Sequence, residues 1–374
     1  MKKIICIHLY NDYSGSPLVL STSIKNLVKR GFEVEVLTSK GTTGFLSGIK
    51  GVRYRNFRYR FYDNKLLRLG MLLWSQLTLF VMMARYRNTG SVVYINTLLP
   101  FGAALGAKLW NLRVVYHMHE TTVNPPILKR FLKAVARRCA SGVIYVSRFL
   151  QRAEPLAGVP STVVYNSLDA EFVKQALDFR NGRHQKPRRF TALMLCSLKA
   201  YKGVDVYVRL AAKLSQYQFL LVLNSDMESI RQYFADTDLP QNLVIFPSAK
   251  SVHSFYEEAH LVLNLSHPLY WVETFGMTLL EGMQYGLPVI GPPVGGPAEI
   301  IRDGYNGFQV DQRNFDSLVD KVNLLATDQQ LYDQMAANAA DFASNFNEEK
   351  FVEGVINALS TEKVQQIPSV ELAA

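Results

Sequence analysis

The 374-residue sequence has little cysteine: Cys6, Cys139 and Cys196 stand far apart, and no CxxC pair occurs. So few and so widely spaced cysteines argue against a disulfide framework or a zinc site and favour a reducing compartment. The first ten residues are too short and wrongly flanked for a signal peptide, so we expect a buried strand there. These features together predict a cytoplasmic protein.

Acidic residues are scarce in the first half of the chain. Residues 1–166 hold 24 Lys and Arg against 6 Asp and Glu, whereas the remainder holds 17 basic and 25 acidic residues. The formal net charge of +10 is therefore the sum of a strongly basic first part and an acidic remainder. A basic half attracts phosphate-rich surfaces, either anionic lipid or nucleic acid. We expect no nucleic-acid partner because no recognised nucleic-acid motif is present, and keep a basic nucleic-acid-binding protein as an alternative.

The sequence also lacks a clean apolar run of the roughly 20 residues that a transmembrane helix needs. Leu66–Ala84 is rich in Leu, Met and Phe, but Arg68, Ser75 and other polar residues interrupt it. Arg53–Lys65, just before it, alternates basic and aromatic residues, which suit a lipid headgroup region. We therefore expect contact with an anionic membrane surface. The alternative is a core helix preceded by a solvated edge strand.

Short apolar runs alternate with helical patterns along most of the chain, which favours parallel sheets covered by helices. The length suits two domains. We expect two doubly wound α/β domains with ligands at the carboxyl ends of the strands. The predicted boundaries are a first domain over 1–170, a polar linker over 171–189, a second domain over 190–345, and a C-terminal helix and tail over 346–374. The helix, around Asn347–Leu359, is expected to cross back to the first domain.

The most informative stretch lies in the second half, where Glu273 and Glu281 flank the sequence Phe275-Gly276-Met277. If Gly276 opens a helix, the free N–H groups of that helix can bind a diphosphate. Glu281 would then lie one to two turns into the helix, where a carboxylate can accept hydrogen bonds from a ribose diol. Taken alone, Glu281 could also lie on a solvated helix face, and Glu273 could be an ordinary acid at the start of a helix.

This stretch resembles glycosyltransferase family 4. The segments Glu273–Glu281, Gly286–Ile290, Gly295–Ile301 and Gly304–Phe308 come in the order and at the spacing of that family. The resemblance implies a GT-B fold, in which two Rossmann-like domains face a central cleft, and a retaining transferase that uses a nucleotide diphosphate sugar. It further implies that Glu281 binds the ribose, that Glu273 lies near the sugar, and that the Phe275–Met277 backbone holds phosphate and sugar.

Lys202-Gly203 matches the lysine–glycine turn of the same family, whose lysine pairs with the donor diphosphate. A cation is needed there because the departing nucleotide gains negative charge. Ser197 stands where the family usually has an arginine, and Lys199 is close enough to substitute for it. Because these groups can supply the positive charge, we expect no metal ion; Asp236–Asp238 is interpreted as a turn or cap.

In the first domain the resemblance is weaker. Gly15 stands where the family has a glycine-rich loop, and it could let backbone donors approach a phosphate. His119 best matches the histidine that faces the donor sugar in the family, and His117 is the alternate. A pair of histidines two positions apart could also bind a metal, and His119 could be an ordinary core histidine.

The resemblance makes the first domain the acceptor side and the second the donor side. No cofactor is expected besides the co-substrate, for which a uridine diphosphate sugar is favoured. The basic first half favours a lipid-linked glycan acceptor for surface polysaccharide, such as lipopolysaccharide or capsule, at the inner face of the cell membrane. A nucleotide-sugar-binding protein without turnover remains an alternative.

Overall fold

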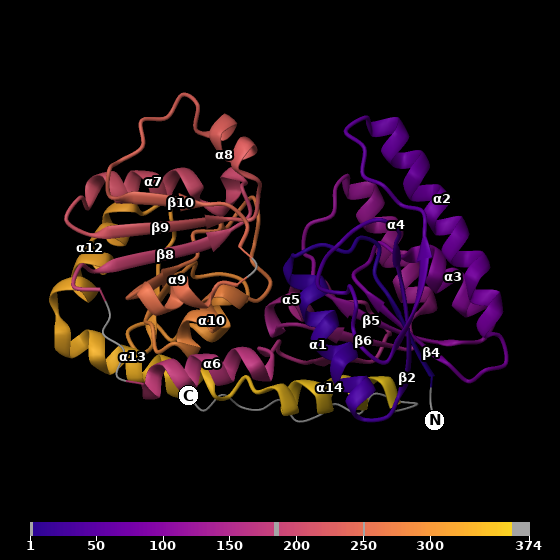
Figure 1. Ribbon diagram of the computed structural model, residues 1–374. Coiled ribbons are helices and arrows are strands. Elements are labelled where there is room, and N and C mark those ends of the chain that lie inside the picture. The colour runs from indigo at the N-terminus through magenta and orange to yellow at the C-terminus, as the bar shows by residue number, and fades with distance from the viewer. Residues whose placement is uncertain (1–2, 183–186, 250, 361–374) are drawn as a thin grey trace. The chain divides into compact units, whose positions relative to one another are not determined.

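The computed structural model describes residues 3–182, 187–249 and 251–360, which fold into two compact units. The first unit runs to Ser167 and takes up the chain again from Glu349, and the second unit is Leu168–Glu348. Each unit is a parallel β-sheet with helices packed on it, which confirms the predicted doubly wound architecture (Figure 1). The tail expected after residue 360 and residues 183–186 of the expected linker lie outside the described residues.

The first sheet has the strand order β3-β2-β1-β4-β5-β6-β7. The central strand β1 is buried throughout Ile4–Ile7, as expected when helices cover both faces of a parallel sheet. The strand order reverses between β1 and β4, so the loops after these two strands diverge there and leave room for a ligand. The elements of this unit are β1 (Lys3–Ile7), α1 (Gly15–Lys29), β2 (Glu33–Ser39), β3 (Val52–Phe57), α2 (Lys65–Met83), η1 (Ala84–Tyr86), β4 (Val92–Asn96), α3 (Phe101–Leu109), β5 (Arg113–Met118), α4 (Pro126–Cys139), β6 (Gly142–Tyr145), α5 (Arg148–Ala153), β7 (Ser161–Val163) and α14 (Glu348–Ser360).

The helix α14 joins the first unit although it comes last in the chain. An Arg113 Nη2 atom on β5 donates a hydrogen bond to the Ala358 carbonyl at 2.8 Å. Gly354 packs so closely on Val164 that a Cβ atom there would lie 2.9 Å from the valine side chain. The first unit is therefore built from both ends of the chain.

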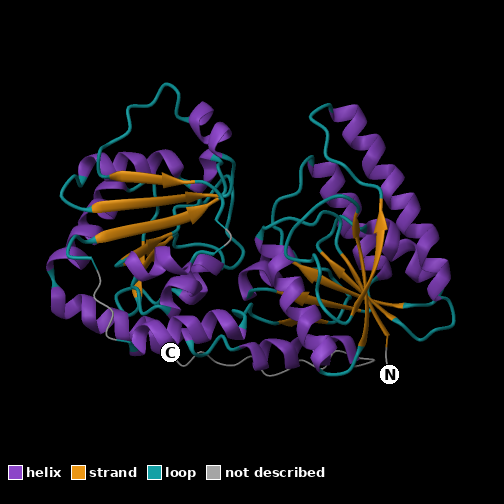
Figure 2. Ribbon diagram, viewed as in Figure 1, coloured by secondary structure: helices purple, strands orange, loops and turns teal. Residues whose placement is uncertain are grey.

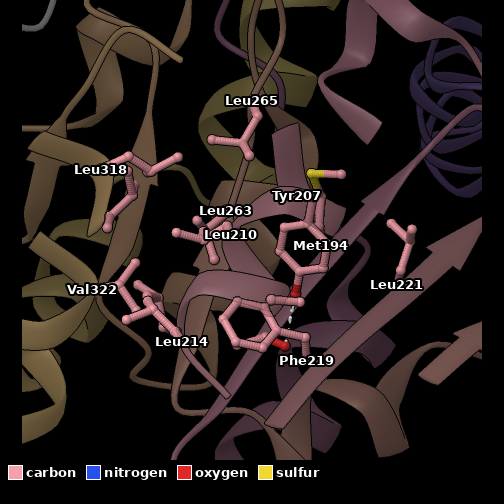
Figure 3. Packing of buried hydrophobic residues seen from close by; sticks show 14 of the residues in the cluster. Met194, Tyr207, Leu210, Leu214, Phe219, Leu221, Leu263, Leu265, Leu318 and Val322 are labelled. Atoms are coloured by element: carbon pink, nitrogen blue, oxygen red, sulfur yellow. Dashed lines mark hydrogen bonds between the residues drawn. The ribbon is translucent and has the colours of Figure 1, made fainter. Parts of the chain in front are cut away.

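The second sheet has the order β10-β9-β8-β11-β12-β13, with the same reversal between its first and fourth strands. Each strand pairs in parallel with its neighbours, and the three longest strands run side by side in one direction in Figure 2. Its core packs α7 and α12 against β8, β9 and β11 (Figure 3). Tyr207 is fully buried there, and its hydroxyl oxygen lies 2.8 Å from the Ala192 carbonyl oxygen and 3.0 Å from that of Leu220. The elements are α6 (Ala170–Asn181), β8 (Thr191–Cys196), η2 (Ala200–Lys202), α7 (Val204–Lys213), β9 (Gln218–Leu223), α8 (Met227–Tyr233), β10 (Leu243–Phe246), α9 (His253–Glu258), β11 (Leu261–Leu263), α10 (Met277–Gln284), β12 (Val289–Gly291), α11 (Pro297–Ile300), β13 (Gly307–Gln309), α12 (Phe315–Thr327) and α13 (Gln329–Ala343).

The expected linker over 171–189 is wrong for most of its described length, because residues 170–181 form α6 of the second unit. The Asp169 side chain caps the helix by accepting a hydrogen bond from the Glu171 N–H. Phe172 then packs on the rings of His253, Tyr256 and Tyr285. The polar residues of this segment lie on the other faces of a docked helix, which composition alone does not reveal.

The helix α1 begins at Gly15, and Pro17 is tolerated because it lies in the first turn. Part of the basic–aromatic segment forms the edge strand β3, which pairs with β2 in parallel over Val52–Phe57. That segment therefore divides into a strand and a loop before α2.

Candidate functional site

In the second unit, Lys202 and Glu273 meet at the reversal of the strand order. Lys202 follows β8 and Glu273 follows β11, the two neighbouring strands between which the order changes. Lys202 Nζ lies 2.5 Å from Glu273 Oε2, and Ser266 Oγ lies 3.4 Å from the same carboxylate oxygen. The sequence places these residues 71 positions apart, and the fold brings them into one ion pair at the position where doubly wound sheets bind ligands.

The Lys202–Glu273 pair is held by its surroundings. The Lys202 ammonium lies 5.6 Å from the centre of the Trp271 ring, and that ring stacks on Tyr201 at 5.0 Å. Both charged side chains are mostly buried, with 16% and 21% of their surface exposed. Burial alone would raise the pKa of Glu273, but the charge and hydrogen bond of Lys202 outweigh it and hold the pKa below its ordinary value. Glu273 is therefore a carboxylate at neutral pH.

Gly276 and Gly296 shape the loop around this pair. Gly276 is the N-cap of α10 with φ of 103°, a conformation that side chains rarely adopt. A Cβ atom on Gly296 would lie 2.2 Å from Phe275 Cα, because the Gly296 N–H donates to the Glu273 carbonyl at 2.8 Å. The glycines thus let the 273–276 loop enter α10 with its N–H groups free of side-chain caps.

The structure separates the roles expected for Phe275 and Met277. The Phe275 side chain is buried, 2% exposed, and packs on the ring of Phe346. Only its backbone can therefore face a ligand. Met277 is the first residue of α10 and is partly exposed, so its N–H lies at the helix start. This arrangement offers an anion the backbone donors of a helix N-terminus, as the sequence predicted for Gly276.

Glu281 lies in the second turn of α10 and contacts a different set of residues. Its carboxylate accepts a short hydrogen bond from the Tyr256 hydroxyl of α9, and Tyr256 stacks on Tyr285 at 5.4 Å. Burial raises the pKa of Glu281 to about 7, against the opposing effect of the Tyr256 hydrogen bond. Glu281 is thus a partly exposed acid beside an aromatic cluster, and it is not a partner of Lys202 in the structure.

Ser197 and Lys199 lie on the turn that leads from β8 to Lys202. The Lys199 N–H donates to the Ser197 carbonyl at 2.8 Å, and the Lys202 N–H donates to the Lys199 carbonyl at 2.9 Å. Ser197 is partly exposed and Lys199 is exposed. Of the two lysines, Lys202 is the one that pairs with Glu273.

The first unit carries a neutral polar network at its own reversal of strand order. His8 follows β1, Asn96 ends β4, and His119 follows β5. The Asn96 Oδ1 atom lies 2.8 Å from His119 Nε2, and its Nδ2 atom lies 3.1 Å from His8 Nδ1. Asn96 Nδ2 also donates to the Ser16 carbonyl at the start of α1. A fully buried amide therefore holds two imidazoles in place.

Burial separates the two histidines that the sequence left as alternates. His117 is 0% exposed, its Nδ1 atom lies 2.6 Å from the Tyr94 hydroxyl, and its ring lies beside Phe351 of α14. His119 is only half-buried, so His119 rather than His117 can reach a ligand. Burial lowers the pKa of His117 to about 3. Burial, with the neighbouring His117 and His8, also lowers the pKa of His119 well below its usual value.

Gly15 has no steric reason to be glycine. It is the first residue of α1, is exposed, and a Cβ atom there would meet nothing within 4 Å. The Asp12 carboxylate already accepts a hydrogen bond from the Ser14 N–H beside it. The role expected for Gly15 in phosphate binding therefore remains a prediction.

Within the part of the chain that the structure describes, no group of three or more His, Cys, Asp or Glu is placed to hold a metal ion. Asp236 lies in the turn after α8, and Asp238 follows in a loop. Asn96, His8, Ser266 and Tyr256 were not predicted from the sequence. The first three lie at or just after strand ends, and that position is the signal that could have identified them.

Two family models match the chain. Residues 176–342 match the family described as Glycosyl transferases group 1, and residues 13–172 match Glycosyltransferase Family 4. Among curated relatives, an uncharacterized glycosyltransferase of Methanocaldococcus jannaschii is 28% identical over 60% of this chain and 61% of its own length. Poly(glycerol-phosphate) alpha-glucosyltransferase of Bacillus subtilis is 25% identical over 36% of this chain and 20% of its own length. The chain thus covers less than two thirds of either relative.

Solved structures resemble the whole chain at low identity. HepE of Anabaena in complex with UDP and glucose has a TM-score of 0.78 at 21% identity, with 96% of this chain and 100% of HepE covered. The lipopolysaccharide outer core galactosyltransferase WaaB has a TM-score of 0.69 at 17% identity, with 96% and 99% covered. These likenesses establish the two-domain, Rossmann-like GT-B fold.

Proposed function

The chain belongs to the family 4-type glycosyltransferases, and from this premise we propose that it transfers a sugar from a nucleotide diphosphate sugar to an acceptor, with retention of configuration. The observation that carries the proposal is the Lys202–Glu273 ion pair beside the N-terminus of α10. A cation and uncapped helix N–H groups can stabilise the negative charge of a pyrophosphate leaving group.

In the proposed reaction the bond between the anomeric carbon and the diphosphate oxygen breaks, the acceptor hydroxyl oxygen forms the new bond to that carbon, and the hydroxyl proton passes to the departing diphosphate oxygen. Lys202 stabilises the negative charge of the departing diphosphate, together with the helix N–H groups that begin at Met277. Lys199 and Ser197 lie on the same turn and would lengthen this anion site. Glu273, ionised beside Lys202, would accept hydrogen bonds from the sugar hydroxyls. Glu281 would accept hydrogen bonds from the ribose diol.

The first unit would supply His119 to the donor sugar, with its imidazole neutral and oriented by Asn96. A neutral imidazole can donate or accept a hydrogen bond near a positively charged transition state without adding charge. Gly15 is proposed to bring α1 backbone donors to the same donor. A uridine diphosphate sugar is the favoured donor, and HepE, of the same fold, was crystallised with UDP-glucose.

We further propose a lipid-linked glycan as the acceptor, in surface polysaccharide synthesis at the inner face of the cell membrane. The basic balance of the first unit supports this choice, since an anionic membrane attracts it. The charge on this unit would also concentrate the protein where a lipid-linked acceptor is found. No metal ion or cofactor is proposed, because Lys202 and the α10 N-terminus supply the positive charge that a divalent ion supplies in other transferases.

A thermal-shift screen with UDP, GDP, ADP and UDP-sugars tests the donor site. A ligand that binds the folded state raises the midpoint of unfolding. We expect UDP and a UDP-sugar to raise it, and Lys202→Ala and Glu281→Ala each to reduce the rise, whereas Lys213→Ala on the far end of α7 leaves it unchanged. No stabilisation by any nucleotide, or equal stabilisation of all variants, would contradict the proposal.

A turnover assay distinguishes a glycosyltransferase from a nucleotide-sugar-binding protein without activity. UDP release in the presence of lipid-linked and soluble glycan acceptors supports transfer, and the anomeric configuration of the product, read by NMR, tests retention. Binding of a UDP-sugar with no release for any acceptor would favour a nucleotide-sugar-binding protein instead.

A further inference from the structure

The helix α2 exposes many apolar side chains, and its buried side holds two polar and two apolar residues. Leu66 is 80% exposed, Trp74 57% and Val81 62%, whereas Ser75, Gln76, Leu79 and Met83 are almost fully buried. A helix on the surface of a water-soluble protein normally turns polar residues outward. The outward face of α2 therefore costs free energy in water and needs an apolar surrounding to cover it.

This orientation is fixed by the packing of α2 on α3. Gln76 Oε1 accepts a hydrogen bond from the Gly102 N–H at 2.9 Å. A Cβ atom on Gly102 would lie 2.0 Å from the Gln76 carbonyl oxygen, and one on Gly106 would lie 2.5 Å from the Phe80 carbonyl oxygen. The backbones are too close for α2 to rotate about its axis. The leucines consequently cannot turn inward.

Exposed apolar residues also occur on α3, which packs beside α2, and on α4, which packs beside α3 (Figure 1). On α3, Leu109 is 59% exposed, and on α4, Ile127 is 76% and Phe131 47% exposed. We call the exposed apolar residues of these three helices the α2–α4 face. Its members are Leu66, Leu67, Leu69, Leu73, Trp74, Leu77, Val81, Leu105, Leu109, Ile127 and Phe131.

Basic residues outnumber acids on and next to the helices of the α2–α4 face. Residues 64–154 contain 13 Lys and Arg and two acids, Glu120 and Glu154, of which Glu154 pairs with Lys129 and Lys133 on α4. Lys65 begins α2, Arg85 and Arg87 follow its end, and α4 carries Arg137 and Arg138 in its last turn. Apolar side chains flanked by cations are the pattern of a helix that lies in the headgroup region of an anionic bilayer.

We propose that the α2–α4 face docks on an anionic lipid leaflet, with α2 lying flat and its apolar side chains in the upper acyl region. A helix of 19 residues lying flat would contact about 28 Å of membrane surface. Lys65–Tyr86 is long and apolar enough to cross a membrane by length and composition. It does not span in this arrangement, because Gln76 and the glycine contacts hold its other face on α3.

Charge selects lipid over the two other occupants. A second copy of the chain would bring two faces of the same positive sign together, which is unfavourable. Nucleic acid phosphates would meet the arginines and lysines but leave the leucines uncovered. The inference deepens the proposed membrane partnership and stands independently of the transfer reaction.

Trp74 is a built-in reporter of this docking. We expect the protein to co-sediment with vesicles of phosphatidylcholine and phosphatidylglycerol and not with phosphatidylcholine alone. Binding should shift the tryptophan emission to the blue, and Trp74→Phe should abolish most of that shift. Acyl chains brominated near the headgroup should quench Trp74 more than chains brominated near their ends.

Matched variants distinguish the contribution of apolar insertion to vesicle binding from the contribution of charge. The double variant Leu73→Ser with Leu77→Ser should weaken vesicle binding by about tenfold or more. It removes the favourable free energy of transferring two leucine side chains from water into the membrane. Leu239→Ser with Val244→Ser, at exposed positions of the second unit, should leave it unchanged. Arg85→Gln with Arg87→Gln should reduce the dependence of binding on salt.

Several outcomes would overturn the proposal: no binding to anionic vesicles, binding with no change in Trp74 emission, or strongest quenching at the bilayer centre. Concentration-dependent self-association lost in the Leu73/Leu77 variant would identify a second copy as the occupant. Retained stabilisation by UDP in the same variants would show that they are folded, so that failure here is distinct from failure of the donor-site proposal.

Discussion

The two sheets of this protein reverse their strand order at equivalent positions but place different chemistry there. In the first unit, His8, Asn96 and His119 form a neutral network, and burial keeps both imidazoles unprotonated near neutral pH. In the second, Lys202 and Glu273 form a charged pair. The same backbone topology thus supports a site without charge and a site built to meet charge, and the difference lies in the residues at the strand ends.

The glycines of the second unit give the largest expected contrast. Gly296→Ala places a Cβ atom 2.2 Å from Phe275 Cα, so the 273–276 loop must move. We expect a loss of about 3 kcal/mol in the free energy of unfolding and loss of stabilisation by UDP. Gly15→Ala enters open space and should change the free energy of unfolding by less than about 0.5 kcal/mol. Urea denaturation measures both, and equal effects would remove the distinction.

Removing the cation of the second unit should affect activity more than stability. Lys202→Ala should lower kcat by about 100-fold or more, because the leaving diphosphate loses its charge partner. Lys202→Arg should recover part of the loss, and Lys199→Ala, at an exposed position, should have a smaller effect. Steady-state kinetics with saturating donor provide the test. A Lys202→Ala enzyme with unchanged kcat would rule out the proposed role.

The neutral network of the first unit is tested by introducing a charge. In Asn96→Asp, a buried carboxylate would lie beside His8 and His119 and raise the pKa of both imidazoles. NMR titration of the histidine ring protons should show this rise. Asn96→Ala should cost about 2 kcal/mol of stability by leaving buried groups without partners. Asn56→Ala, at an exposed position on β3, is the matched control and should be neutral.

The smallest expected effect is a pH dependence that comes from Glu281. Its pKa is 4.5 ordinarily and about 7 in the folded protein, so the folded state holds the proton to higher pH than the unfolded state. The contribution of protonated Glu281 to the free energy of unfolding is complete below pH 4.5 and is lost as the pH rises toward 7. Glu281→Gln mimics the protonated acid. The free energy of unfolding of the variant, relative to that of wild type, should therefore be about 1 to 2 kcal/mol higher at pH 8 than at pH 5. Denaturation curves of both proteins at the two pH values measure this difference. A difference that does not change with pH would contradict the raised pKa.

Much of the fold could be predicted because the signals are local. Buried parallel strands are short apolar runs in the sequence, and the alternation of such runs with helical patterns is sufficient to predict parallel sheets covered by helices. The helix α6 was missed because its docking depends on Phe172 meeting His253, Tyr256 and Tyr285, which lie at least 80 positions away. A polar segment becomes a docked helix only when its partners are known.

The candidate site also has parts that local motifs predict and parts that depend on long-range contacts. Glu273 and Lys202 were identified from separate motifs, but their pairing required the fold. Asn96 carries no motif, since a lone asparagine at the end of an apolar run has many ordinary explanations. Its importance is visible only when the structure places His8, Ser16 and His119 around its amide. Long-range hydrogen bonds of this kind leave no periodic trace in a sequence.

The position of α14 has a consequence for how the protein is made. Because Arg113 and Val164 contact a helix that begins at residue 348, the first unit cannot be finished until the second has left the ribosome. His117 stays without its Phe351 neighbour through all of that synthesis. We expect the nascent first unit to need protection during this interval, and the docking of α14 to be the step that completes that unit.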